Sequence, residues 1–333
     1  MGYGYMQYYV NGINTKRNND YGCKQMVIVE MAKFLNADYQ MISLGNWRFD
    51  YNHNSDISIG EKLIQIYPSD YEKHIYEFHG LRTTHITSST CKMKKIVFER
   101  LQRNLPTIVH SDVYWCPWYS AFKRIHYSHY YLIVGFNEES NDLICYDPIL
   151  CDQHVYSNID ILFMGIDKLI TVELQECHLQ PKLTHYLKTL YEDARELREN
   201  MNYANNMMDF ANDIQFCFDR KKEFDTCRND YDQAAITPLI DNLRDIFVYR
   251  IGYANMIDYV CNMICAPCQA ELRNDMDSCI SMWKMIRFKF IRMALGRQKD
   301  LEVNEMVAYD ILRLSKAELE LSDKIVYNIG KYI

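Results

Sequence analysis

The chain has 333 residues, 48% of them hydrophobic and 24% charged, a composition that fits a folded globular protein and excludes a disordered or fibrous one. This length predicts two domains, because one hydrophobic core rarely serves more than about 250–300 residues. The net charge is −7 without a cluster of lysine or arginine, so we expect no nucleic-acid partner. No apolar stretch of about 18 residues and no secretory signal is evident, so we expect a cytoplasmic protein with no membrane partner.

The first part of the chain mixes helices and strands. Apolar spacing predicts helices over residues 24–35 and 92–103. Runs of β-branched and aromatic residues predict four strands, over residues 106–113, 129–136, 142–146 and 169–174. The second and third strands are joined by residues 137–141, and so short a connection requires an antiparallel hairpin. We therefore expect an α+β domain over residues 1–180.

The composition changes near Pro181. Most of the glycine, proline and histidine residues precede this position, and the residues after it carry apolar side chains at helical spacing. The sequence therefore predicts a second domain, a helical bundle over residues 181–333.

Cys23 follows Gly22 and begins a strongly apolar predicted helix. The positive end of a helix dipole stabilises a thiolate, and the free N–H groups there can bind an oxyanion. Cys23 is thus a candidate nucleophile. The alternative is a structural cysteine packed at a helix start.

His129 and Asp147 stand at the start of one predicted strand and just after the next. In a hairpin these positions fall side by side, so the carboxylate can fix the imidazole tautomer while the other ring nitrogen faces Cys23. The order Cys23, His129, Asp147 predicts a catalytic triad. Taken singly, a structural histidine and a turn aspartate are the alternatives.

Three segments together resemble a known family. They are residues 23–51, residues 111–114 and residues 129–148, and they are similar to the N-terminal domain family of butirosin biosynthesis protein H. The resemblance implies a papain-like fold related to bacteriocin peptidases. By position it makes Cys23 the acyl-accepting nucleophile, His129 the general base and Asp147 the group that orients His129.

The resemblance also implies a function in natural-product biosynthesis with nonribosomal peptide pathways, such as those that make antibiotics. An acyl or peptidyl carrier protein would donate a thioester-linked acyl or aminoacyl group to Cys23, and a small amine would accept it. The enzyme itself would need no cofactor, because the phosphopantetheine belongs to the carrier protein. Basic residues of the later helices, Arg250 among them, could receive the acidic carrier protein or its phosphate; solvated helix faces are the alternative.

Further residues near these motifs are candidates for substrate contacts. Asn18 and Asn19 precede Cys23 and could donate to an oxyanion, or belong to a polar loop. Trp47 and Phe49 lie in a segment similar to the family's pocket-side strand and could line an acyl pocket, or simply pack.

Asp112 and Tyr114 follow a predicted strand, and they could bind the amine through charge and hydrogen bonding. Tyr114 begins the segment Tyr-Trp-Cys-Pro-Trp, where the family would have a more aliphatic turn. This departure from the family pattern affects the expected identity of the substrate more than the expected type of reaction.

Metal binding is disfavoured. His126 and His129 have helical spacing but precede a strand, and zinc usually takes three or four ligands. The twelve cysteines are scattered through a long chain, which favours reduced thiols. For four of them three interpretations remain: a structural metal site, a redox pair, or buried packing. These cysteines are Cys261, Cys265, Cys268 and Cys279.

The sequence thus predicts a cysteine-dependent, amide-forming acyltransferase. A cysteine hydrolase, a peptidase or amidase with the same triad, is the alternative, and a non-catalytic scaffold that binds a carrier protein is another.

Overall fold

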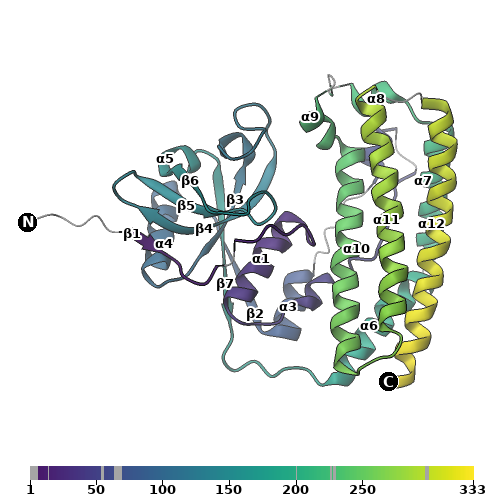
Figure 1. The fold of residues 1–333 in the computed structure, drawn as a ribbon, viewed down its shortest axis with the longest axis horizontal. Helices are drawn as coiled ribbons and strands as arrows, with labels where there is room; N and C mark the ends of the chain where they lie inside the picture. Colours follow the sequence, from purple (N-terminus) through teal and green to yellow (C-terminus); the bar gives the residue numbers. More distant parts are fainter. Residues whose placement is uncertain are drawn as a thin grey trace, which may run out of the picture. The chain divides into compact units, whose positions relative to one another are not determined.

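The computed structural model of the protein describes residues 7–13, 15–53, 56–63, 70–199, 201–225, 227, 230–296 and 300–333. The chain divides into two compact units (Figure 1). Unit 1 comprises Met1–Tyr39 and Ile75–Leu179, and unit 2 comprises Gln40–His74 and Gln180–Ile333. The predicted boundary near residue 180 is present, but residues 40–74 belong to unit 2 and not to the first domain.

Unit 1 contains a seven-stranded antiparallel sheet with the strand order β2-β7-β3-β4-β5-β6, and β1 also pairs with β4. The predicted hairpin is present as β4 and β5. The strands that the sequence analysis did not predict, β1, β2 and β6, are short or mostly lie outside the core. The strands are β1 (Gln7–Tyr9), β2 (Leu81–Ile86), β3 (Thr107–Asp112), β4 (Ser128–Asn137), β5 (Asp142–Tyr146), β6 (Val155–Asn158) and β7 (Ile166–Leu174).

Helix α1 (Cys23–Phe34) packs on β4 and β7. Its residues 25–32 are all buried, as expected for a helix that is apolar almost all round. Helix α4 (Thr90–Gln102) packs on β4 and β1. Both helices were predicted to within two residues. Unit 1 also contains the 3₁₀ turn η2 (Val113–Trp115) and the short helix α5 (Ile159–Leu162), and α3 (Tyr71–His79) crosses the boundary between the units.

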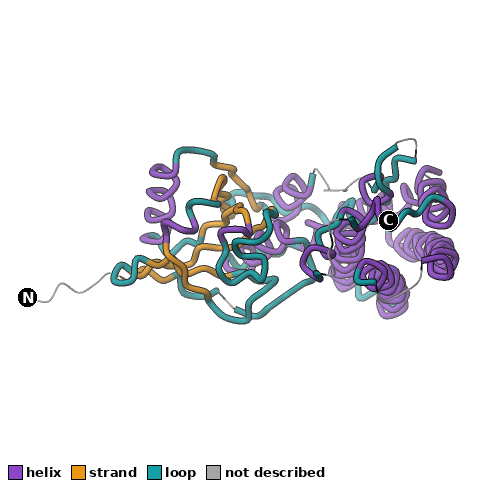
Figure 2. Tube along the Cα trace, turned by 90° about the horizontal axis from the view of Figure 1, so that it is seen from above, coloured by secondary structure: helices purple, strands orange, loops and turns teal. Residues whose placement is uncertain are grey.

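Unit 2 is helical, as predicted. Helices α10, α11 and α12 run side by side (Figure 1) and are seen nearly end-on in Figure 2. Helices α6 and α7 pack against α12. The elements are η1 (Gln40–Ser43), α2 (Ile59–Lys62), α6 (Leu183–Glu199), α7 (Met201–Phe216), α8 (Arg220–Phe224), α9 (Tyr231–Ala235), α10 (Pro238–Met263), α11 (Gln269–Ala294), α12 (Asp300–Ile329) and η3 (Gly330–Tyr332).

A buried carboxylate lies at the centre of unit 2. Glu318 of α12 has no exposed surface. Its carboxylate accepts hydrogen bonds from Trp47 (3.0 Å), Trp283 (2.8 Å), Arg250 (3.1 and 3.2 Å) and Tyr203. Burial alone would favour the protonated acid, but Arg250 and the other donors hold the pKa of Glu318 below its ordinary value.

Arg250 explains why residues 40–74 belong to the helical unit. Besides Glu318, its guanidinium donates to the backbone carbonyls of Asn46 (3.2 Å) and Arg48 (2.9 Å). Arg250 is only 1% exposed, so it cannot receive a carrier protein as the sequence analysis considered. An arginine in an apolar helix marks a buried ion pair here, whose partner lies 68 residues later.

Among the residues that the structure describes, none of the helices combines the length and apolar character needed to cross a bilayer.

The Glu318 network predicts a large effect on stability. Glu318→Ala leaves the Arg250 charge buried and unpaired, so we expect the free energy of unfolding to fall by about 3–5 kcal/mol. This change can be measured by chemical denaturation with tryptophan fluorescence as the readout. Glu320→Ala is the matched control, because Glu320 is 63% exposed on the same helix and should matter by less than about 0.5 kcal/mol. Equal losses for the two variants would contradict this account.

Candidate functional site

Cys23 is the first residue of α1, and its side chain is half-buried. Gly22 precedes it in an extended conformation and accepts the first helical hydrogen bond, from Met26 N at 2.8 Å. The first turn of α1 contains no acidic side chain. The positive end of the helix is therefore not neutralised locally, which favours an anion at Cys23.

The pairing of β4 with β5 brings His129 and Asp147 together. Leu132 pairs with Tyr146, so Asp147 lies diagonally across from His129 on the same face of the hairpin. His129 Nε2 and Asp147 Oδ2 are 2.7 Å apart. His129 is 4% exposed and Asp147 is fully buried, so their interaction is shielded from water.

Asp147 receives further hydrogen bonds that keep it ionised. The indole of Trp118 donates to Oδ2 at 3.0 Å, and the backbone N–H groups of Ile149 and Leu150 donate to Oδ1 at 3.2 and 3.3 Å. Burial favours the protonated acid, but His129 and these donors lower the pKa of Asp147. The carboxylate is thus an anion at neutral pH.

Cys23 also interacts with His129 and contributes to the raised pKa of its imidazole. Since Nε2 is used by Asp147, the nitrogen that remains for the thiol is Nδ1. Burial alone would lower the pKa of His129, but Asp147 and Cys23 together raise it to about 10. The imidazole is therefore protonated at neutral pH, where it can stabilise a Cys23 thiolate. The predicted triad residues are adjacent in the structure.

Two aromatic residues of the loop between β3 and β4 cover this cluster. Tyr119 packs edge-on against His129, with 5.7 Å between ring centroids. Trp118 packs edge-on against Tyr131 at 5.0 Å while it donates to Asp147. The sequence analysis missed both residues. The sequence indicates only that a buried tryptophan N–H needs a hydrogen-bond acceptor, and it does not indicate which residue is the acceptor.

The structure does not bring Asn18 and Asn19 to Cys23 through any described contact. Asn18 N donates to Pro148 O at 2.7 Å, and Asn18 Oδ1 accepts from Asp20 N at 2.9 Å. Asn18 thus ties its loop to the turn after Asp147. Both residues line an open pocket of about 390 Å³, together with Lys16, Arg17, Asp20, Glu30 and Lys33.

Asp112 and Tyr114 make local contacts, and none of the described contacts supports amine binding there. Asp112 Oδ1 accepts from the backbone N–H of Tyr114 at 3.0 Å and of Tyr127 at 3.1 Å. Its Oδ2 lies 2.5 Å from His126 Nδ1. The Tyr114 ring stacks on His126 with 4.3 Å between centroids. Asp112 thus fixes the two ends of the loop that carries Trp118.

Trp47 and Phe49 are core residues of unit 2. Each is 2% exposed. Trp47 donates to Glu318, and Phe49 stacks on Trp283 with 5.7 Å between centroids. Both side chains are thus packed in the interior of the bundle, which is the alternative given in the sequence analysis, and they also line the small pocket of unit 2.

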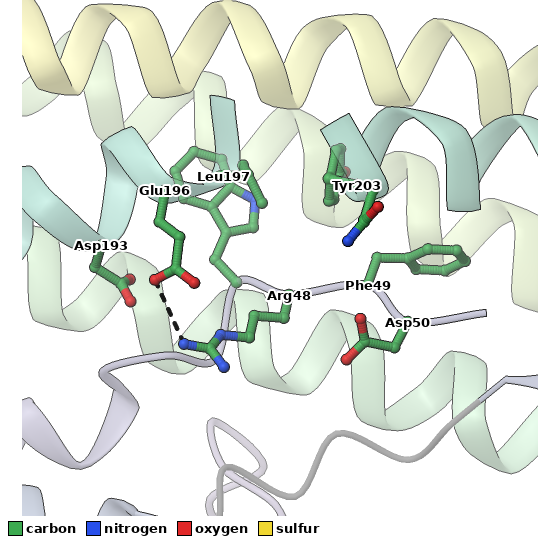
Figure 3. Close-up of a pocket in the computed structure, with 9 residues that line it drawn as sticks. Arg48, Phe49, Asp50, Asp193, Glu196, Leu197 and Tyr203 are labelled. Carbon is green, nitrogen blue, oxygen red and sulfur yellow. Dashed lines mark ion pairs between the residues drawn. The ribbon is translucent and has the colours of Figure 1, made fainter. Parts of the chain in front are cut away.

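Unit 2 contains a small pocket of about 100 Å³ (Figure 3). Arg48 and Glu196 form an ion pair of 3.6 Å across it, and the carboxylate of Asp193 lies beside them (Figure 3). Loss of hydration raises the pKa of Asp193 to about 6, although Arg48 favours the carboxylate. A volume of this size admits a few water molecules.

Four cysteines lie between the last turn of α10 and the middle of α11. Cys261 and Cys279 are buried, Cys265 is exposed, and Cys261 contacts Cys268. Within the described residues, no three side chains of His, Cys, Asp or Glu converge as metal ligands.

Comparison with models of known protein families and with curated proteins finds no match to this chain.

The geometry predicts an unusual titration of His129. With a pKa raised to about 10, the imidazolium should persist above pH 6.5 and be lost as the pH rises through about 10. In Asp147→Asn only burial and Cys23 remain, so the ring should be neutral at pH 7. NMR of ¹⁵N-histidine in full-length protein measures this. Asp152→Asn, an exposed carboxylate of the same turn, should leave His129 unchanged. A wild-type midpoint near pH 6.5 would contradict the assignment.

Proposed function

We propose that unit 1 is a papain-like cysteine domain that transfers acyl groups through a Cys23 acyl-enzyme. The observation that carries the proposal is the position of His129, which bonds the buried Asp147 carboxylate through Nε2 and also interacts with Cys23. The resemblance of the segments around these residues to the butirosin biosynthesis protein H family supports the same roles.

The chemistry follows from these groups. The Cys23 thiolate attacks the acyl carbonyl, and the C–S bond to the donor thiol breaks while His129 gives its proton to that leaving thiolate. Neutral His129 then takes a proton from the incoming amine, which attacks the acyl-enzyme and releases Cys23 as a thiolate. Backbone N–H groups at the start of α1 are the donors proposed for the tetrahedral oxyanion.

The donor in this proposal is a thioester on an acyl or peptidyl carrier protein, and the acceptor is a small amine. A thioester suits a thiolate nucleophile because thiol–thioester exchange is nearly balanced in energy. Phosphopantetheine would be carried by the partner, and the reaction needs no cofactor on this chain. We propose that it takes place in the cytoplasm, in the biosynthesis of a natural product.

A cysteine hydrolase is the second candidate. The same three residues would form the same acyl-enzyme, but water would replace the amine in the second step. The half-buried position of Cys23 is compatible with either acceptor. A scaffold that binds a carrier protein without chemistry would not need a cysteine next to the His129 and Asp147 pair.

Selective alkylation tests the nucleophile. At pH 6 we expect iodoacetamide to modify Cys23 at least about tenfold faster than Cys151, because His129 stabilises the Cys23 thiolate. Cys151 is the matched control: it is also half-buried, but burial and Asp147 raise its pKa to about 11. Peptide mapping gives both rates. His129→Ala should remove the preference for Cys23. Equal rates in the wild type would count against the proposed enzyme.

Acyl transfer can be measured with a small acyl thioester of N-acetylcysteamine. We expect mass spectrometry to show one acyl group on Cys23, and none on Cys23→Ala. His129→Ala should slow acylation by about 10²–10⁴-fold. Added primary amine then distinguishes the candidates, since a transferase forms the amide and a hydrolase releases the acid. If no acyl group appears on Cys23 in folded wild-type protein, the acyl-enzyme proposal is wrong.

A further inference from the structure

Unit 1 contains a further hydrogen-bonded relay of three side chains, none of which takes part in the Cys23 site. It consists of one residue from each of three strands: Ser128 in β4, His110 in β3 and Asp167 in β7. His110 Nε2 is 2.7 Å from Ser128 Oγ, and His110 Nδ1 is 2.5 Å from Asp167 Oδ1. A hydroxyl, an imidazole and a carboxylate are thus connected in series.

The pairing of β3 with β4 explains how Ser128 reaches His110. Asp112 pairs with Ser128, and His110 pairs with Tyr130, so Ser128 is the diagonal neighbour of His110 on one face of the sheet. The neighbouring residues Ser111 and His129 are buried and point to the other face. The relay therefore lies on the opposite face from the Cys23 and His129 pair.

A β-bulge directs Asp167 toward His110. In the pairing of β3 with β7, His110 pairs with Lys168 and Ser111 pairs with Ile166, so Asp167 is an extra residue between two pairs. Bulges turn a side chain away from the regular alternation of a strand. Without this bulge, the residues at 167 and 168 would alternate and Asp167 would point away from the face that carries His110.

The relay is accessible to solvent. Ser128 is exposed, the His110 side chain is 20% exposed, and the Asp167 side chain is 66% exposed. The Tyr130 ring packs against His110 with 4.7 Å between centroids. Asp167 accepts the Nδ1 proton, which leaves the Nε2 lone pair to accept the proton of the Ser128 hydroxyl. This is the arrangement that activates a serine nucleophile.

We propose that Ser128, His110 and Asp167 form a second nucleophilic site, which reacts with small activated esters. Ser128 Oγ bonds to the acyl carbon as the ester C–O bond breaks, and its proton passes through His110 Nε2 to the leaving alkoxide. Water then hydrolyses the acyl-serine and releases the carboxylic acid. The site lies on the surface of the sheet, so it fits a compact, activated substrate better than a long one. It does not depend on the proposed function of Cys23.

A fluorophosphonate probe tests this site in the full-length Cys23→Ala protein. The serine oxygen displaces fluoride from phosphorus, and peptide mapping locates the adduct. We expect Ser128 to be labelled, and we expect His110→Ala to reduce its labelling rate about tenfold or more. Asp167→Asn should reduce it less. Ser120→Ala is the control, because this exposed serine of the same unit should not affect labelling of Ser128.

Two outcomes would overturn the proposal. One is labelling of Ser128 at the same rate as Ser120, and the other is a Ser128 rate that His110→Ala leaves unchanged. Either would mean that the relay only holds three strands together. Thermal unfolding of each variant shows that it is folded, and iodoacetamide labelling of Cys23 in Ser128→Ala shows that the other face is intact. Loss of Cys23 reactivity alone would affect only the proposed function.

Discussion

The arrangement of the candidate site depends on one constraint, which is that the Asp147 carboxylate has no contact with water. A buried carboxylate is costly unless its lone pairs are used and its charge is balanced. His129, Trp118 and two backbone N–H groups meet both needs. Each of them is therefore held in one orientation, and His129 in turn presents its other nitrogen to Cys23. The fixed geometry of the site is thus a consequence of compensating one charge.

Unit 2 also contains a buried carboxylate whose charge must be compensated, but there the compensation stabilises a core. Glu318 is as deeply buried as Asp147, but its donors are Arg250, two indoles and a phenol, all of them buried side chains of unit 2. The charge of this network is balanced within the core, and no nucleophile takes part. A buried ion pair therefore indicates chemistry only when one of its members also reaches an accessible reactive group, as His129 does.

The helices and strands with a strong periodicity of apolar residues could be predicted from the sequence. The antiparallel hairpin followed from the five residues between its strands, and the hairpin places His129 beside Asp147. What could not be predicted are contacts that depend on loops and on long-range pairing. Trp118 reaches Asp147 because of the path of the loop from Val113 to Tyr127, and Trp47 packs with Tyr253 and Glu318, which are 206 and 271 positions later. Aromatic residues at 47 and 49 have the same local pattern in a core as in a pocket, so only the fold distinguishes them.

The discontinuity of both units affects how the chain can fold during synthesis. Residues 40–74 leave the ribosome early, but the helices that cover Trp47 and Phe49 are made only after residue 180. The sheet of unit 1 can be completed in the meantime, because β7 ends at Leu174. Until these helices are synthesised, the segment that contains Trp47 and Phe49 has no hydrophobic core in which to pack. A nascent chain stopped near residue 180 would thus carry a complete sheet together with an apolar loop that a chaperone could bind.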